Sequence, residues 1–221
     1  FIAVAAVGWI IEKVIVQRLY HRPLDTILAT WGIGIILQQL VRLSVGAESR
    51  FVKGPEILSG NTQIGGLIMS NYRLFVIVFS LSVLAASWAL MTKTEFGMKL
   101  RAVIQNRKIS ECYGIEAKNI YSFTFAYGAG LAGIAGALIT PLFSTIPTMG
   151  TGLVVDAFLV VIVGGLGSLL GAATASVLIG EATALFSMLF NDTLGRIAVL
   201  AGIIVLIRFR PRGLFPSNTR R

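Results

Sequence analysis

Charged residues are scarce in this chain of 221 residues: they make up 13% of it, whereas hydrophobic residues make up 55%. The mean hydropathy is +0.82. A soluble domain carries about 25% charged residues, which it needs to cover its surface with groups that water solvates. The composition therefore excludes a soluble globular protein. It predicts an all-α, polytopic transmembrane helical bundle with most of its surface in lipid.

Cysteine and histidine are nearly absent, since the chain has only Cys112 and His21. A single cysteine excludes an internal disulfide, and neither residue has partners at metal-ligand spacing, so we expect no metal site. We also find no nucleophile–base pair, and we expect no catalytic residue and no cofactor. The net charge of +9 would suggest nucleic acid in a soluble protein. In a membrane protein Lys and Arg gather in cytoplasmic loops instead, and we expect no nucleic acid partner.

A nucleotide-binding loop is also lacking, although the stretch GGLGSLLGAATASVLIG at residues 164–180 looks like one. A Walker A loop needs a lysine after its last glycine, and here Ala172 follows Gly171. Small residues four apart predict close helix packing instead. The positions that we assign to helix packing are Gly128, Gly136, Gly164, Gly165, Gly167, Ser168 and Gly171.

Apolar segments recur along the chain, and a full crossing of the bilayer takes about 20 residues. The candidate crossings are residues 1–16, 27–41, 72–91, 120–143, 153–163, 168–190 and 194–207. The glycines that follow predict short or broken helices near residues 153–167. Whether residues 153–163 cross the membrane or re-enter it stays open, although a crossing places all the basic segments on one side.

We treat residues 1–221 as a single transmembrane domain. The chain begins inside an apolar helix, so we expect N-terminal spans to be missing from it. Pro23 is expected to end the first helix, and Asp25 or Thr26 to cap the next one. Residues 42–71 are expected outside the bilayer, where they could carry a short hairpin.

The longest polar stretch, residues 92–119, is expected in the cytoplasm. Thr92 and Glu95 fit a capping box, and Gly114 fits a left-handed helix end. The apolar face of the helix between them is assigned to Phe96, Leu100, Val103 and Ile104. Such a helix either lies on lipid or docks into a groove of a soluble partner.

Polar residues also occur at predicted membrane depth, where they are costly and mark a pathway or a buried partner. The residues that we assign to a substrate pathway are Thr30, Gln38, Gln39, Asp156 and Glu181. Interhelical hydrogen bonding is the alternative for the first three. Asp156 could instead lie at the outer interface, and Glu181 could pair with Arg196.

Several strings resemble one known family, the high-affinity branched-chain amino acid permeases, which are membrane subunits of ABC importers. They are RPLDTILATWGIGIILQQLVR, TEFGMKLRAVIQNRKISECYGI, AFLVVIVGGLGSLLGA after P-x-MG, and the closing RPRGLF. Within the family, PLDTILATWG and the segment that follows it look most like the urea-type permeases. The resemblance covers nearly all of the chain.

The resemblance implies a permease in the bacterial cytoplasmic (inner) membrane that imports urea or a branched-chain or other small amino acid. It implies four kinds of partner: a second homologous permease, two cytoplasmic ATPase subunits, an extracytoplasmic solute-binding protein and membrane lipid. Residues 92–119 would be the coupling loop in an ATPase groove, with Glu95, Gly97, Arg101, Gln105, Asn106 and Gly114 as its residues. A stand-alone secondary transporter or channel for a small polar solute is the alternative.

Overall fold

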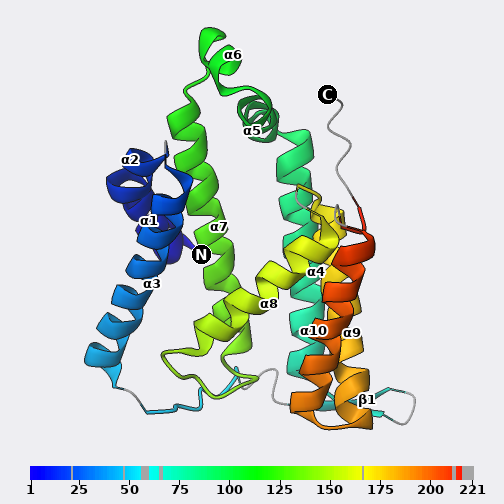
Figure 1. Cartoon of the computed structure of the whole chain (residues 1–221). Coiled ribbons are helices and arrows are strands. Elements are labelled where there is room, and N and C mark those ends of the chain that lie inside the picture. Colours follow the sequence, from blue (N-terminus) through cyan, green and yellow to red (C-terminus); the bar gives the residue numbers. More distant parts are fainter. Residues whose placement is uncertain are drawn as a thin grey trace. The chain divides into compact units, whose positions relative to one another are not determined.

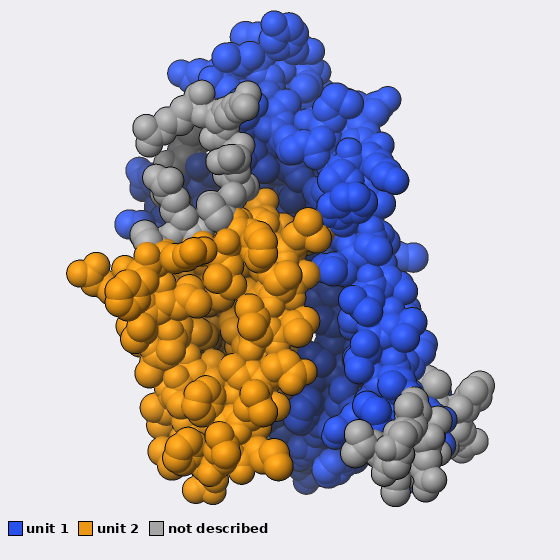
Figure 2. Space-filling view, turned by 90° about the vertical axis from the view of Figure 1, so that its right-hand side faces the viewer, with its two compact units in different colours: residues 1–148 blue, residues 149–221 orange. Residues whose placement is uncertain are grey.

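The computed structural model describes residues 1–20, 22–46, 48–55, 60–64, 67–165, 167–210 and 213–215. His21 and the last basic residues of the tail lie outside these ranges. The chain divides into two compact units, Phe1–Thr148 and Met149–Arg221, which Figure 2 shows in different colours.

The first unit contains most of the helices and one hairpin. Its elements are α1 (Ile2–Ile11), the π-helix η1 (Glu12–Val16), α2 (Gln17–Leu19), α3 (Pro23–Val45), β1 (Asn61–Ile64), β2 (Leu67–Ser70), α4 (Asn71–Lys93), α5 (Glu95–Gln105), α6 (Arg107–Cys112) and α7 (Ala117–Ile139). The strands pair antiparallel, with Asn61 opposite Ser70, so the hairpin expected within residues 42–71 is present.

The prediction for the start of the second helix was wrong. Pro23 begins α3 as its first residue instead of ending the preceding helix, and neither Asp25 nor Thr26 is the cap. Proline suits the first helical position because its missing N–H would have no partner there. The Thr26 hydroxyl donates to the Leu19 carbonyl at 2.9 Å instead, which closes the corner between α2 and α3.

Close backbone approach holds α1 against α7. A Cβ placed on Gly8 would lie 2.5 Å from the Cβ of Ala129, and one on Gly133 would lie 2.7 Å from Val4. Gly130 faces the Phe1 ring in the same way, with 2.5 Å to its nearest carbon. On α7, Gly130 and Gly133 lie on a different face from Gly128 and Gly136. At the latter two an added Cβ meets nothing within 4 Å among the described residues. Within this chain, α7 therefore packs through another set of small residues than the one we assigned.

Two side-chain hydrogen bonds tie α4 to α7. The Tyr72 hydroxyl donates to the Leu138 carbonyl at 3.0 Å, and the Ser87 and Tyr127 hydroxyls lie 2.6 Å apart. The α5–α6 segment lies past one end of α4 and α7, and the hairpin lies near the other end of α4 (Figure 1). The polar loop and the hairpin are thus kept at opposite ends of the same helix.

The second unit consists of three helices, α8 (Met149–Gly164), α9 (Leu169–Leu189) and α10 (Asp192–Phe209). Its core is formed by Val163, Ala175, Val199 and Ile203. The expected break is present between α8 and α9, where Gly165 and Gly167 have φ of 99° and 86°. Only glycine adopts such angles readily.

The break brings two backbones together. A Cβ on Gly164 would lie 2.5 Å from the Ala172 nitrogen, and one on Gly171 would overlap the Gly164 carbonyl oxygen. Ser168 caps α9 by accepting from the Gly171 N–H at 3.0 Å. Leu214 lies against the same place, since its N–H donates to the Val163 carbonyl at 2.8 Å.

Among the described residues, four helices are long and apolar enough to cross a membrane. They cover Leu24–Val45, Asn71–Lys93, Ala117–Ile139 and Leu169–Leu189. The short segment expected at residues 153–163 is a helix of 16 residues, α8, which is longer than predicted. The chain is therefore an all-α membrane bundle, with its broken helix at the predicted place.

Gly171→Ala tests the junction between α8 and α9. We expect a lower melting temperature for the purified chain, because the added methyl group overlaps the Gly164 carbonyl and overpacking costs about 1–3 kcal/mol. Gly180→Ala is the matched control in the same helix, since a Cβ there meets nothing within 4 Å. Thermal unfolding in detergent measures both variants. Equal midpoints would contradict the packing described here.

Candidate functional site

The polar loop folds as two short helices, α5 and α6. The cap of α5 is Thr94, whose hydroxyl oxygen accepts from the Gly97 N–H at 3.4 Å. The predicted capping box from Thr92 to Glu95 was therefore wrong by two residues. Thr92 still belongs to α4, and its hydroxyl donates to the Trp88 carbonyl at 2.7 Å. A threonine at either position can cap a helix, and the length of α4 decides between them.

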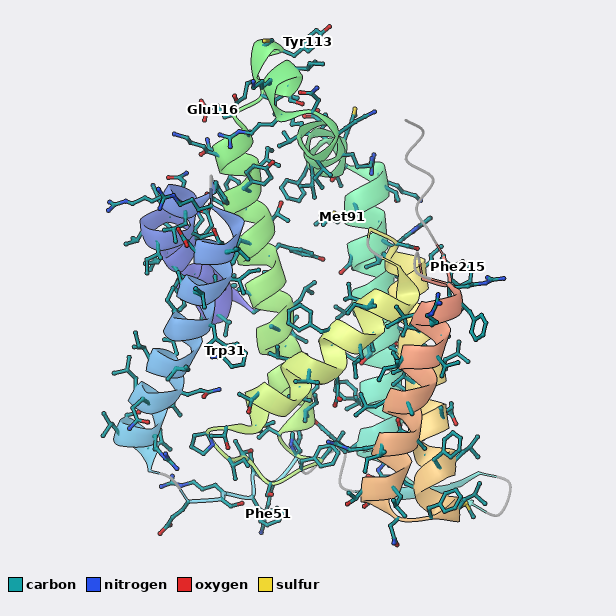
Figure 3. All side chains as sticks on the ribbon, in the orientation of Figure 1. Trp31, Phe51, Met91, Tyr113, Glu116 and Phe215 are labelled. Atoms are coloured by element: carbon teal, nitrogen blue, oxygen red, sulfur yellow. The ribbon has the colours of Figure 1, made fainter. Side chains whose placement is uncertain are left out.

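The end of α4 and the first turns of α5 meet at Met91, labelled in Figure 3. A Cβ on Gly97 would overlap the Met91 carbonyl oxygen, so only glycine fits there without a shift. The Arg101 guanidinium donates to the same carbonyl. Gly97 and Arg101, two of the residues assigned to coupling, therefore fix the angle at which α5 leaves the membrane helix.

Asn106 and Gly114 set the bounds of α6. The Asn106 side-chain oxygen accepts from the Ile109 N–H at 3.2 Å, so it caps a second helix. Gly114 has φ of 79° and ends that helix, as predicted. The sequence was interpreted as one helix, and it contains two because Asn106 itself has an extended backbone.

The two faces of α5 differ sharply in exposure. Leu100 and Val103 are buried, with 7% and 1% of their surface exposed, and Ile104 is 67% exposed. Ile104 belongs to the predicted apolar face, but unlike Leu100 and Val103 it stays exposed within this chain. Exposed apolar side chains continue past α5, and Tyr113, which follows α6 directly and is labelled in Figure 3, is 83% exposed. Gln105 is exposed as well.

Two ion pairs lie on the surface of this loop. Lys99 reaches Glu95 at 3.0 Å, and Arg107 reaches Glu111 at 2.9 Å. The hydrogen bond to Glu111 raises the pKa of the Arg107 guanidinium above its ordinary value. Exposed pairs of this kind add little stability, about 0–1 kcal/mol each. Glu95 thus lies on the solvated face of α5, away from the Met91 contact.

A cavity of about 720 Å³ lies among the three helices of the second unit. Its polar lining consists of Asp156 from α8, Ser176 and Thr183 from α9, and Arg196 from α10. Aliphatic side chains make up most of the rest, namely Val155, Leu159, Val160, Ile179, Val199 and Leu200. Ser176 and Gly180 come from the small-residue stripe in α9, so part of that stripe lines a cavity and part of it packs.

The other residues assigned to a pathway are divided between the units, with Glu181 in α9 and Thr30, Gln38 and Gln39 in α3. Glu181 is exposed and outside the cavity lining, and no ion pair joins it to Arg196 in the part of the chain that the structure describes. Thr30 donates to the Thr26 and Ile27 carbonyls of its own helix, each at 3.0 Å. Gln38 is half-buried and Gln39 is exposed.

Sequence reasoning missed a buried carboxylate in the first unit. Residues 1–16, which include Glu12, were interpreted only as an apolar candidate crossing. Glu12 is 0% exposed, and it accepts hydrogen bonds from the Tyr20 and Ser122 hydroxyls. Burial and the neighbouring Glu12 raise the pKa of the Tyr20 phenol. A lone acid in an apolar run was the signal that could have marked this site.

Among the described residues, no three or more His, Cys, Asp or Glu side chains lie close enough together to hold a metal ion.

One family model matches the chain over residues 1–208, that of the branched-chain amino acid transport system permease component. The chain belongs to this family. It is therefore a multi-pass membrane permease and not an enzyme.

Among curated relatives of this permease is the high-affinity branched-chain amino acid transport system permease protein BraD of Pseudomonas aeruginosa. It is 28% identical over 220 residues, which cover 96% of this chain and 71% of BraD. LivH of Escherichia coli (strain K12), a protein of the same description, is 28% identical over 218 residues, 95% of this chain and 70% of LivH.

A more distant relative is the ribose import permease protein RbsC of Bacillus subtilis. It is 28% identical over 127 residues, which cover 54% of this chain and 39% of RbsC. No solved structure matches the permease.

Gly97→Ala tests the junction of α4 and α5. We expect the amides of α5 to exchange with deuterium about tenfold faster, because the new methyl group pushes α5 away from the Met91 carbonyl. Met98→Ala is the control, since that neighbouring side chain is 61% exposed. Mass spectrometry of peptides from residues 92–119 measures both. Wild-type exchange in the Gly97 variant would show that the junction tolerates the methyl group.

Proposed function

We propose that the chain is the membrane-spanning permease subunit of an ATP-driven importer in the bacterial cytoplasmic (inner) membrane. The family match supports the transport role, and the missing Walker A lysine means that ATP hydrolysis falls to other subunits. The partners are two cytoplasmic ATPase subunits, a second homologous permease and an extracytoplasmic solute-binding protein.

The α5–α6 segment is the coupling element in this proposal. It combines a rigid attachment to α4, made by Gly97 and Arg101 at Met91, with exposed apolar side chains such as Met98, Ile104 and Tyr113. An amphipathic helix with free apolar groups fits a groove of a soluble partner. A push from that partner is transmitted to α4 because the junction cannot bend without breaking these contacts.

The solute is a branched-chain amino acid, and the observation that carries this choice is the cavity of the second unit. An amino acid is a zwitterion at neutral pH, with an ammonium group for Asp156 and a carboxylate for Arg196. Neither residue forms an ion pair with another described residue, so both charges are available to a solute. The aliphatic lining suits a branched apolar side chain.

Urea is the second candidate, favoured by the resemblance of PLDTILATWG at residues 23–32 to the urea-type permeases. A neutral solute needs donors and acceptors but no counter-charge. Urea would thus rely on hydroxyl and amide groups, such as those of Thr183 in the cavity and Gln38 on α3. The two solutes make different demands on Asp156 and Arg196, and this difference separates them.

Uptake into proteoliposomes tests the importer. With both permeases, the ATPases and the binding protein present, we expect ATP to drive accumulation of labelled leucine, and omission of ATP to abolish it. Labelled urea in a parallel reaction identifies the solute. Full-rate uptake by the chain alone, without ATP or partners, would establish the alternative of a stand-alone transporter or channel.

Asp156→Asn and Arg196→Gln test the cavity. Each change removes one counter-charge, and loss of a hydrogen bond to a charged group raises the KM for leucine uptake roughly tenfold or more. Asp192→Asn is the control, since Asp192 is an exposed acid in the same unit and does not line the cavity. An unchanged KM for leucine in both variants would exclude the cavity from the path of the amino acid.

A further inference from the structure

Glu12 is an acidic residue that is shielded from solvent and forms no ion pair with a described cation. It is 0% exposed and is one of the two largest side chains that are fully buried. The ion pairs of the described residues all involve other acids, and the adjacent Lys13 lies over the Trp9 ring, 4.5 Å from its centre. A buried charge is costly unless hydrogen bonds satisfy it. Its neighbours are two hydroxyls, those of Tyr20 and Ser122.

The local helix geometry explains how Tyr20 reaches back to Glu12. In a regular α-helix, residues eight apart point about 80° away from each other. The π-helical turn at Glu12–Val16 adds one residue to the turn, so the two side chains are brought to within about 20° of the same face. Turns of this kind are rare inside helices and are frequent at functional sites.

Ser122 connects this carboxylate to the polar loop. It lies in the second turn of α7, a helix that begins at Ala117, directly after Gly114 and Glu116 have ended the loop (Figure 3). Ala117 is 1% exposed, and α5 packs against α7 as well. A displacement of the α5–α6 segment therefore reaches the start of α7 within two helical turns of Ser122.

Tyr20 connects the same carboxylate to α3. It follows α2 directly, and the corner between α2 and α3 is closed by the bond from Thr26 to the Leu19 carbonyl. The tilted contact between Tyr20 and Tyr121, with ring centres 5.2 Å apart, adds a second link to α7. Within the described part of the first unit, α3 packs mainly at this corner, and none of the residues in its apolar stretch is buried.

We propose that Glu12 is a positioning residue that couples the polar loop to α3. It holds the start of α7 to the α2–α3 corner, so that a movement of α5 and α6 by the ATPases shifts α3 together with α7. The inference rests on the proposed function, since it needs an ATP-driven partner. It assigns to Glu12, Tyr20 and Ser122 a role in transmission that neither the family match nor the relatives describe.

A purely structural role makes a different prediction. Well-packed apolar residues of similar volume often replace a buried polar cluster without loss of stability. If Glu12 served stability alone, an apolar version of the cluster would fold and transport like the original. If the directional hydrogen bonds transmit movement, the apolar version folds but transmits poorly, because apolar contacts allow the helices to slide.

The test compares uptake per ATP hydrolysed in the complete reconstituted complex. The main variant combines Glu12→Met, Tyr20→Phe and Ser122→Ala. We expect an unchanged or higher melting temperature, retained ATP hydrolysis, and uptake of labelled leucine per ATP reduced roughly tenfold. Glu12→Gln keeps the volume and a neutral acceptor, and should reduce uptake per ATP about threefold, because charge-assisted bonds are stronger.

Lys13→Gln is the matched control, since it removes the neighbouring charge of the same π-helical turn without touching the cluster. It should leave uptake per ATP unchanged. Wild-type uptake per ATP in the apolar variant would overturn the role of Glu12 and leave the importer intact. Where that variant does not assemble, wild-type uptake per ATP in Glu12→Gln overturns it equally. Absence of ATP-driven uptake of leucine and of urea in the unmodified complex would overturn the proposed function, and this inference with it.

Discussion

Close approach of one helix backbone to another is the constraint on which both units depend. Lipid is as apolar as the side chains, so membrane helices gain little from burying apolar surface against each other, and small residues that allow contact take over that task. Gly8 against Ala129 holds α1 to α7, and Gly164 against Gly171 holds the broken end of α8 to α9. By fixing how neighbouring helices pack, these contacts also set the positions of the polar side chains within each unit.

The two units enclose charge in opposite ways. Glu12 is sealed between helices and satisfied by two hydroxyls, which suits a fixed link within the first unit. Asp156 and Arg196 border an open cavity without an ion pair among the described residues, which suits contact with a passing solute. The proposed link at Glu12 and the proposed solute site at Asp156 and Arg196 therefore differ in how many protein partners each charge has.

The polar loop shows how much of a site the sequence can predict. Its place between two membrane helices, its amphipathic character and its end at Gly114 all follow from composition and glycine chemistry. The cap at Thr94 did not follow, because it depends on where α4 ends. The break at Asn106 and the exposure of Ile104 were missed as well, since the helix was interpreted as continuous with one apolar face. The crowding of Gly97 and the bond of Arg101 at Met91 depend on the same crossing of α4 and α5.

The sequence by itself determined the solvent, the helical class, the family resemblance and the break after residue 163, because charge content, apolar length and glycine act locally. Only the tertiary structure decided which glycines pack and which acid is buried. Gly130 and Gly128 are two residues apart in one helix, and of two acids in apolar segments Glu12 is buried whereas Asp156 is exposed. Such differences arise from contacts between residues far apart in the chain, for example the hydrogen bond between Ser122 and Glu12. A local sequence pattern does not specify these contacts.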